Sequence, residues 1–79
     1  MVLTAESIRQ MKDEELAALE SAMEDVLSYF ATEDRIETLT SLMRLVNNIC
    51  LERSIDTKYY IQKNSVEVQA AYDKFRHIL

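Results

Sequence analysis

The sequence predicts an all-α fold: a small antiparallel helical bundle of three long helices plus a short N-terminal helix, in a single domain of residues 1–79. Three observations support this prediction. The chain contains neither glycine nor proline, the residues on which tight turns and sheet corners depend. Apolar residues in three long segments recur at alternating intervals of three and four, the period of an amphipathic helix. Hydrophobic residues make up 48% of the chain, too many for a disordered protein.

Two N-terminal helices are predicted from their capping residues. Thr4 can cap a short first helix over residues 5–11. Asp13 can cap a second helix that we expect to end near Ala31, with acidic residues in its first turn at the positive end of the helix dipole. The apolar residues of this second helix share one face: Leu16, Leu19, Met23, Val26, Leu27 and Phe30.

A third helix is predicted over residues 33–53, where the apolar residues cover about half of the helix circumference. These residues are Ile36, Leu39, Leu42, Met43, Leu45, Val46, Ile49 and Cys50. A helix packed on one neighbour needs a narrower apolar face, so we expect this helix to be central, touching several neighbours or a second subunit. The expected oligomer interface consists of Leu42, Leu45 and Ile49.

Asp56 or Thr57 can cap the last helix, which we expect to end near His77. The residues after Asn64 have a spacing like that of a capping box, which leaves a break there open, but we prefer one continuous helix. In a continuous helix, a second apolar stripe lies opposite the core face and suits a partner protein or a second copy. The stripe consists of Tyr59, Val66, Ala70 and His77. With a kink at Asn64, the same residues would be scattered over the surface.

Charge is distributed unevenly along the chain, which carries a net charge of −5. Residues 1–40 contain ten acids and three bases, whereas residues 41–79 contain four acids and six bases. The acidic total argues against general binding to nucleic acid or to an anionic membrane. No apolar run is long enough for a membrane span, and the N-terminus lacks the pattern of a signal peptide. With a single cysteine, the composition fits a cytoplasmic protein.

Acidic residues of the second helix form two lines on a helical wheel, with small residues between them. Glu20 and Glu24 belong to one line, and Glu14 and Asp25 to the other. One interpretation is a shallow acid-rimmed groove that binds a basic surface of another protein. The other is a solvated face that keeps the protein soluble.

The sequence offers little for catalysis, and we expect no enzymatic activity, no metal and no cofactor. Phosphate-binding loops need glycine, which is absent. Cys50 falls on the apolar row of the third helix, where a cysteine behaves as a small hydrophobic residue. Asp73 and His77 are spaced to share a proton or a weakly held metal, but no third ligand accompanies them.

We therefore expect a non-enzymatic protein–protein interaction module, a small regulator or inhibitor that uses its helix faces and forms a homodimer. By analogy with other small acidic helical proteins, we expect a phage or another mobile element to encode it. The alternative is a small DNA-binding regulator that uses the basic C-terminal half. Its contact residues would be Lys58, Tyr59, Tyr60, Lys63, Lys74 and Arg76.

Overall fold

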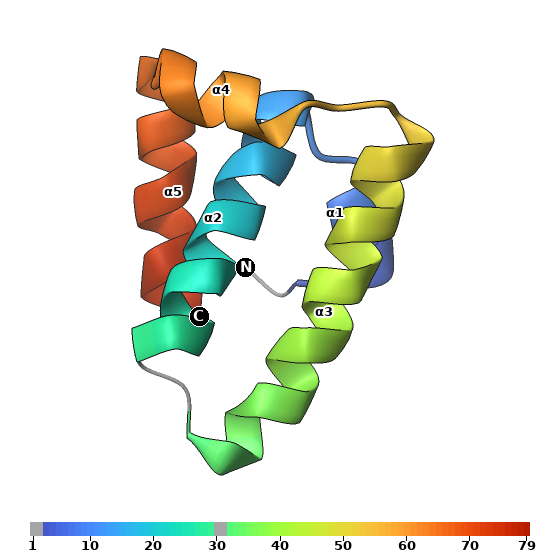
Figure 1. Ribbon diagram of the computed structural model, residues 1–79, viewed down its shortest axis with the longest axis vertical. Coiled ribbons are helices and arrows are strands. Elements are labelled where there is room, and N and C mark those ends of the chain that lie inside the picture. The colour runs from blue at the N-terminus through green and yellow to red at the C-terminus, as the bar shows by residue number, and fades with distance from the viewer. Residues whose placement is uncertain (1–2, 30–31) are drawn as a thin grey trace.

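The computed structural model describes residues 3–29 and 32–79, and all regular secondary structure in these two ranges is helical. The helices are α1 (Ala5–Arg9), α2 (Asp13–Tyr29), α3 (Glu33–Glu52), α4 (Thr57–Lys63) and α5 (Val66–Ile78). In Figure 1, α3 runs back alongside α2, α4 crosses one end of the molecule, and α5 returns in the same direction as α2. The prediction of an all-helical fold is confirmed.

Side-chain caps define where three of the helices begin. Thr4 accepts a hydrogen bond from the Ser7 amide, and Ser7 reciprocates, so α1 begins with a capping box. The Asp56 carboxylate accepts from the Tyr59 amide at 3.4 Å and caps α4. The Ser65 hydroxyl accepts from the Val68 amide at 3.2 Å and caps α5. The end predicted for the second helix near Ala31, and Phe30 of its apolar face, lie outside the described residues.

We preferred one continuous helix from Asp56 or Thr57 to His77. This prediction is wrong, because the helix is interrupted at Asn64. Asn64 has φ 49° and ψ 50°, the left-handed conformation that ends a helix. Asparagine tolerates this conformation better than most residues other than glycine. Ser65 then starts α5, so this region forms two helices.

The central helix of the molecule is α2. We expected the helix at residues 33–53 to be central, and within the single chain this prediction is wrong. Helix α2 contacts α3, α4 and α5. It buries a set of residues that includes three alanines: Leu16, Ala17, Ala18, Leu19, Ala22, Met23 and Val26. Small side chains allow neighbouring helices to approach α2 beside its leucine face. On α3 only Leu39, Val46, Ile49 and Cys50 are buried, so much of its apolar surface stays partly open.

Helix α1 is linked to the end of α3 by an exposed Arg9–Glu52 ion pair of 3.5 Å and, more extensively, by Arg53. The Arg53 guanidinium donates to the carbonyl oxygen of Met11 at 2.6 Å and also to the carbonyl oxygen of Arg9. It lies 3.7 Å from the carboxylate of Asp13. Arg53 therefore satisfies carbonyls at the C-terminal end of α1, which a helix cannot bond internally. Ile8 and Met11 are thereby held in the core.

Candidate functional site

The acidic face predicted on the second helix is partly covered by α4. Ala17, which lies between the two acidic lines, is completely buried. The hydroxyl group of Thr57, at the start of α4, donates to a carboxylate oxygen of Glu20 at 3.4 Å. Glu24 remains exposed, and Asp25 is half-buried. The face is therefore a hollowed surface between helices.

Two neighbouring cavities remain along this face, with volumes of about 330 Å³ and 380 Å³. Both are lined by Ser21 of α2 and Ile61 of α4, so they adjoin each other at these two residues, and we treat them together as one groove. Four carboxylates line the groove: Glu20, Glu24, Asp25 and Asp73. Lys58 is the cation among the lining residues, which gives the groove an excess of negative charge. We call it the acidic groove and define it by Glu20, Ser21, Glu24, Asp25, Lys58, Ile61 and Asp73.

Two titrating groups show how the acidic groove is constrained. Burial, and then the neighbouring charge of Glu24, raise the pKa of Glu20, while the hydrogen bond from Thr57 lowers it. The Tyr72 hydroxyl donates to the Asp25 carboxylate, and this bond is the main cause of the raised pKa of Tyr72. Tyr72 thus fixes the position of Asp25. The sequence pattern alone gave no sign of this role for Tyr72.

Glu14, the remaining predicted acid, does not belong to the acidic groove. It lines another cavity, of about 330 Å³, between the start of α2 and α5. Ala70, predicted for the apolar stripe, lines the same cavity. Both acidic and basic residues line this cavity, and the Lys74 ammonium lies 3.7 Å from the carboxylate of Glu15. The structure therefore brings Glu20, Glu24 and Asp25 together and separates Glu14 from them.

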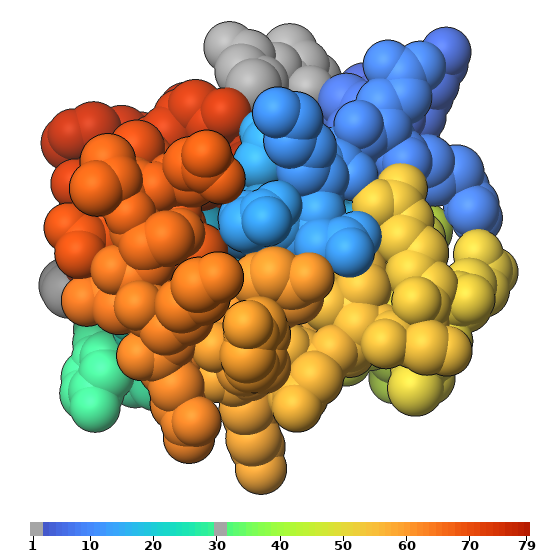
Figure 2. Space-filling view, turned by 90° about the horizontal axis from the view of Figure 1, so that it is seen from above, coloured from blue at the N-terminus to red at the C-terminus, as the bar shows by residue number. Residues whose placement is uncertain are grey.

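The predicted apolar stripe is not continuous, because the break at Asn64 separates Tyr59 on α4 from the rest of the stripe on α5. All four residues are nevertheless exposed, with Val66 81% and Tyr59 54% accessible; the other two are Ala70 and His77. In the view from above, α4 and the start of α5 lie side by side at the end of the molecule that α4 crosses (Figure 2). Tyr59 packs edge-to-face on Tyr60, with ring centroids 5.3 Å apart.

Two of the six residues of the DNA-binding alternative, Tyr60 and Lys74, contact acidic groups. The Tyr60 hydroxyl donates to Asp13 at 3.4 Å. Lys74 pairs with Glu15 and also lies over the ring of Phe75. Lys58 lines the acidic groove. Nucleic-acid phosphates would have to compete with these carboxylates for the same cations.

The residues predicted for an oligomer interface divide between the core and the surface. Ile49 is 2% exposed and belongs to the core of its own chain. Leu42 and Leu45 are half-buried and pack against the edge of that core. A second copy could reach Leu42 and Leu45 without unfolding the chain, whereas Ile49 is enclosed.

Catalytic and metal-binding features are sparse in the described part of the chain. Cys50 is buried, as its position on the apolar row predicted. Asp73 and His77 are both exposed on α5. Within residues 3–29 and 32–79, no three or more His, Cys, Asp or Glu side chains are placed to hold a metal ion. In the same ranges, every helix is too short or too polar to cross a membrane.

The chain was compared with protein-family models, curated proteins and solved structures, and no significant match was found in any of the three.

Proposed function

We propose that the protein is a non-enzymatic, cytoplasmic interaction module that regulates or inhibits a partner protein by binding a basic segment of it in the acidic groove. The scaffold is a bundle of α2, α3 and α5, in which α3 runs opposite to α2 and α5, with α1 packed beside it and α4 laid across one end. Self-association as a homodimer is part of this proposal. The observation that carries it is the arrangement of four carboxylates and one lysine around a cavity pair with an apolar centre.

The groove combines two kinds of contact that a partner segment can use. Ile61, which is 37% exposed, provides apolar surface within it. The surrounding carboxylates attract cationic side chains, which speeds association and favours basic partners over acidic ones. A basic segment with an apolar residue between its Lys or Arg residues matches this pattern.

Glu20 and Glu24 give a further reason to expect a cationic partner. Their charges repel each other, which contributes to the raised pKa of Glu20. A lysine or arginine placed between the two carboxylates removes that repulsion and favours the charged form of Glu20. Binding of a cation therefore relieves an unfavourable interaction that is present in the free protein.

The test is affinity capture from the lysate of the source cells with the wild-type protein and two charge-reversal variants. Glu24→Lys reverses a charge of the acidic groove. Glu37→Lys makes the same change at an exposed position of α3 and is the matched control. We expect a partner that is retained by the wild type and by Glu37→Lys, lost with Glu24→Lys, and released by added salt. Equal retention by the two variants would remove the acidic groove as the binding site.

A further inference from the structure

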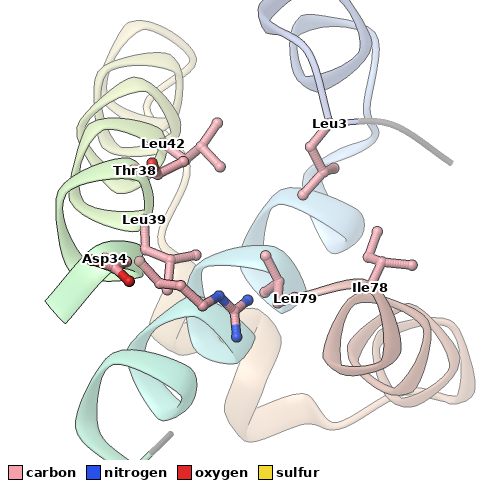
Figure 3. A pocket seen from close by; sticks show the side chains of 8 residues that line it. Leu3, Asp34, Thr38, Leu39, Leu42, Ile78 and Leu79 are labelled. Atoms are coloured by element: carbon pink, nitrogen blue, oxygen red, sulfur yellow. The ribbon is translucent and has the colours of Figure 1, made fainter. Parts of the chain in front are cut away.

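A second surface of the molecule lies away from the acidic groove, between the first turns of α3 and the C-terminal end of α5. A cavity of about 390 Å³ opens there. Figure 3 shows its walls, with α3 on one side, the end of α5 on the other and Leu3 between them. Five apolar residues line it: Leu3, Leu39, Leu42, Ile78 and Leu79. Leu39 is buried, so the other four provide the apolar surface that a second molecule can reach. We call this surface the leucine pocket and define it by these five residues with Asp34 and Arg35.

Two opposite charges lie beside each other at the leucine pocket. Asp34 and Arg35 are consecutive residues in the first turn of α3, and both line the cavity. Both side chains are exposed. Within the described residues, neither takes part in an ion pair or a hydrogen bond. The leucine pocket thus presents apolar surface together with one free anion and one free cation.

A surface with these properties is complementary to itself. In a two-fold symmetric dimer the same patch meets its own copy, so that residue i contacts residue j and residue j contacts residue i. Asp34 of each copy can then face Arg35 of the other, and the two ion pairs form symmetrically around the apolar residues. Ile78, which lines the pocket, is 39% exposed and is therefore accessible to a second copy.

We propose that the leucine pocket is the surface through which two copies of this chain form a homodimer, with reciprocal Asp34–Arg35 ion pairs across the two-fold axis. Leu42 is shared with the interface expected from the sequence, whereas Ile49 is excluded because it is enclosed in the core. This inference deepens the self-association in the proposed function and does not depend on the acidic groove. A second copy is the occupant that this charge pattern fits, because the patch presents an acid and a base side by side.

Sedimentation equilibrium over the micromolar range tests the proposal with three variants. Arg35→Asp places two acids at each end of the interface, where they meet two acids of the other copy. The double exchange Asp34→Arg with Arg35→Asp restores reciprocal pairing with the charges swapped. Arg44→Asp is the matched control, because Arg44 is exposed on the same helix and does not line the leucine pocket. Circular dichroism establishes that each variant is helical before it is compared.

We expect a wild-type dimer, a loss of dimer affinity of about tenfold or more for Arg35→Asp, and a recovery to within about threefold for the double exchange. Arg44→Asp should resemble the wild type. A wild-type protein that stays monomeric throughout the range overturns the proposal, and so does an Arg35→Asp variant that dimerises as well as Arg44→Asp. A folded double exchange that fails to recover affinity overturns the reciprocal pairing. Glu24→Lys should leave the dimer intact, and Arg35→Asp should leave partner capture intact, so the two proposals fail independently.

Discussion

Replacing Arg53 by methionine should destabilise the protein more than any other change of a surface charge. Methionine keeps most of the apolar stem of arginine but removes the guanidinium, which donates to the carbonyls of Met11 and Arg9 and pairs with Asp13. A hydrogen bond from a charged donor contributes about 1.5–3 kcal/mol when it is protected from water. Because the Arg53 side chain is 32% exposed, each bond should lie at the low end of that range. The expected loss is about 2–3 kcal/mol for the two bonds together.

Thermal unfolding followed by circular dichroism measures this loss directly. A loss of about 2–3 kcal/mol lowers Tm by about 8–24 °C in a domain of this size. Arg44→Met, an exposed arginine on the same helix, is the control and should stay within about 0.5 kcal/mol of the wild type. Arg53→Lys should fall between the two, because an ammonium keeps the charge but cannot fork between two carbonyls in the guanidinium geometry.

Hydrogen exchange of the α1 amides provides a second measurement of the same contact. If Arg53 holds α1 to α3, its replacement should raise the exchange rate of the α1 amides more than that of the α2 amides. An Arg53→Met variant as stable as Arg44→Met would show that α1 is held by other contacts, such as those of Ile8 and Met11, and the reasoning from the guanidinium would be refuted.

Two further predictions concern the groove and the helix break. Because the folded pKa of Glu20 is raised above its ordinary value of 4.5, the folded state binds this proton more tightly than the unfolded state, and stability falls as pH rises through that window. Glu20→Gln should therefore be more stable than the wild type by a few tenths of a kcal/mol at about pH 7 and equal to it below about pH 4, as measured by urea unfolding; equal stabilities at both pH values would contradict this. Ser65→Ala should cost about 1 kcal/mol in the same assay, because the Val68 amide loses its capping partner, while Ser65→Asp should be neutral.

The positions of the helices could be predicted from the sequence because their signals are local. Caps and apolar spacing gave starts at residues 5 and 33, which are the first residues of α1 and α3, and Asp56 was one of the two caps expected for the helix that begins at Thr57. Asp13 was expected as a cap and is instead the first residue of α2. The break at Asn64 was harder to predict, because the apolar spacing continues across this position while the polar residues that follow it indicate a new helix cap. Packing decides between the two signals: the break allows α4 to lie across α2 and α5 to lie along it.

The candidate site was only half visible in the sequence. Glu20, Glu24 and Asp25 could be found because they repeat on one helix. Their neighbours in the acidic groove come from α4 and α5, distant in sequence, and no local pattern associates them with α2. Arg53 was missed for the same reason, since it lies 42 residues from the Met11 carbonyl that it bonds.

The arrangement of α2 and α5 also has a consequence for how the chain folds. This pair makes the most extensive helix–helix contact of the described residues. The bonds between Tyr60 and Asp13 and between Tyr72 and Asp25 each join residues 47 positions apart. Much of the core therefore forms only after a long loop has closed, and loop closure costs entropy before the contacts repay it. Despite its helical content, this protein should fold more slowly than a bundle in which neighbouring helices in sequence make the main contacts.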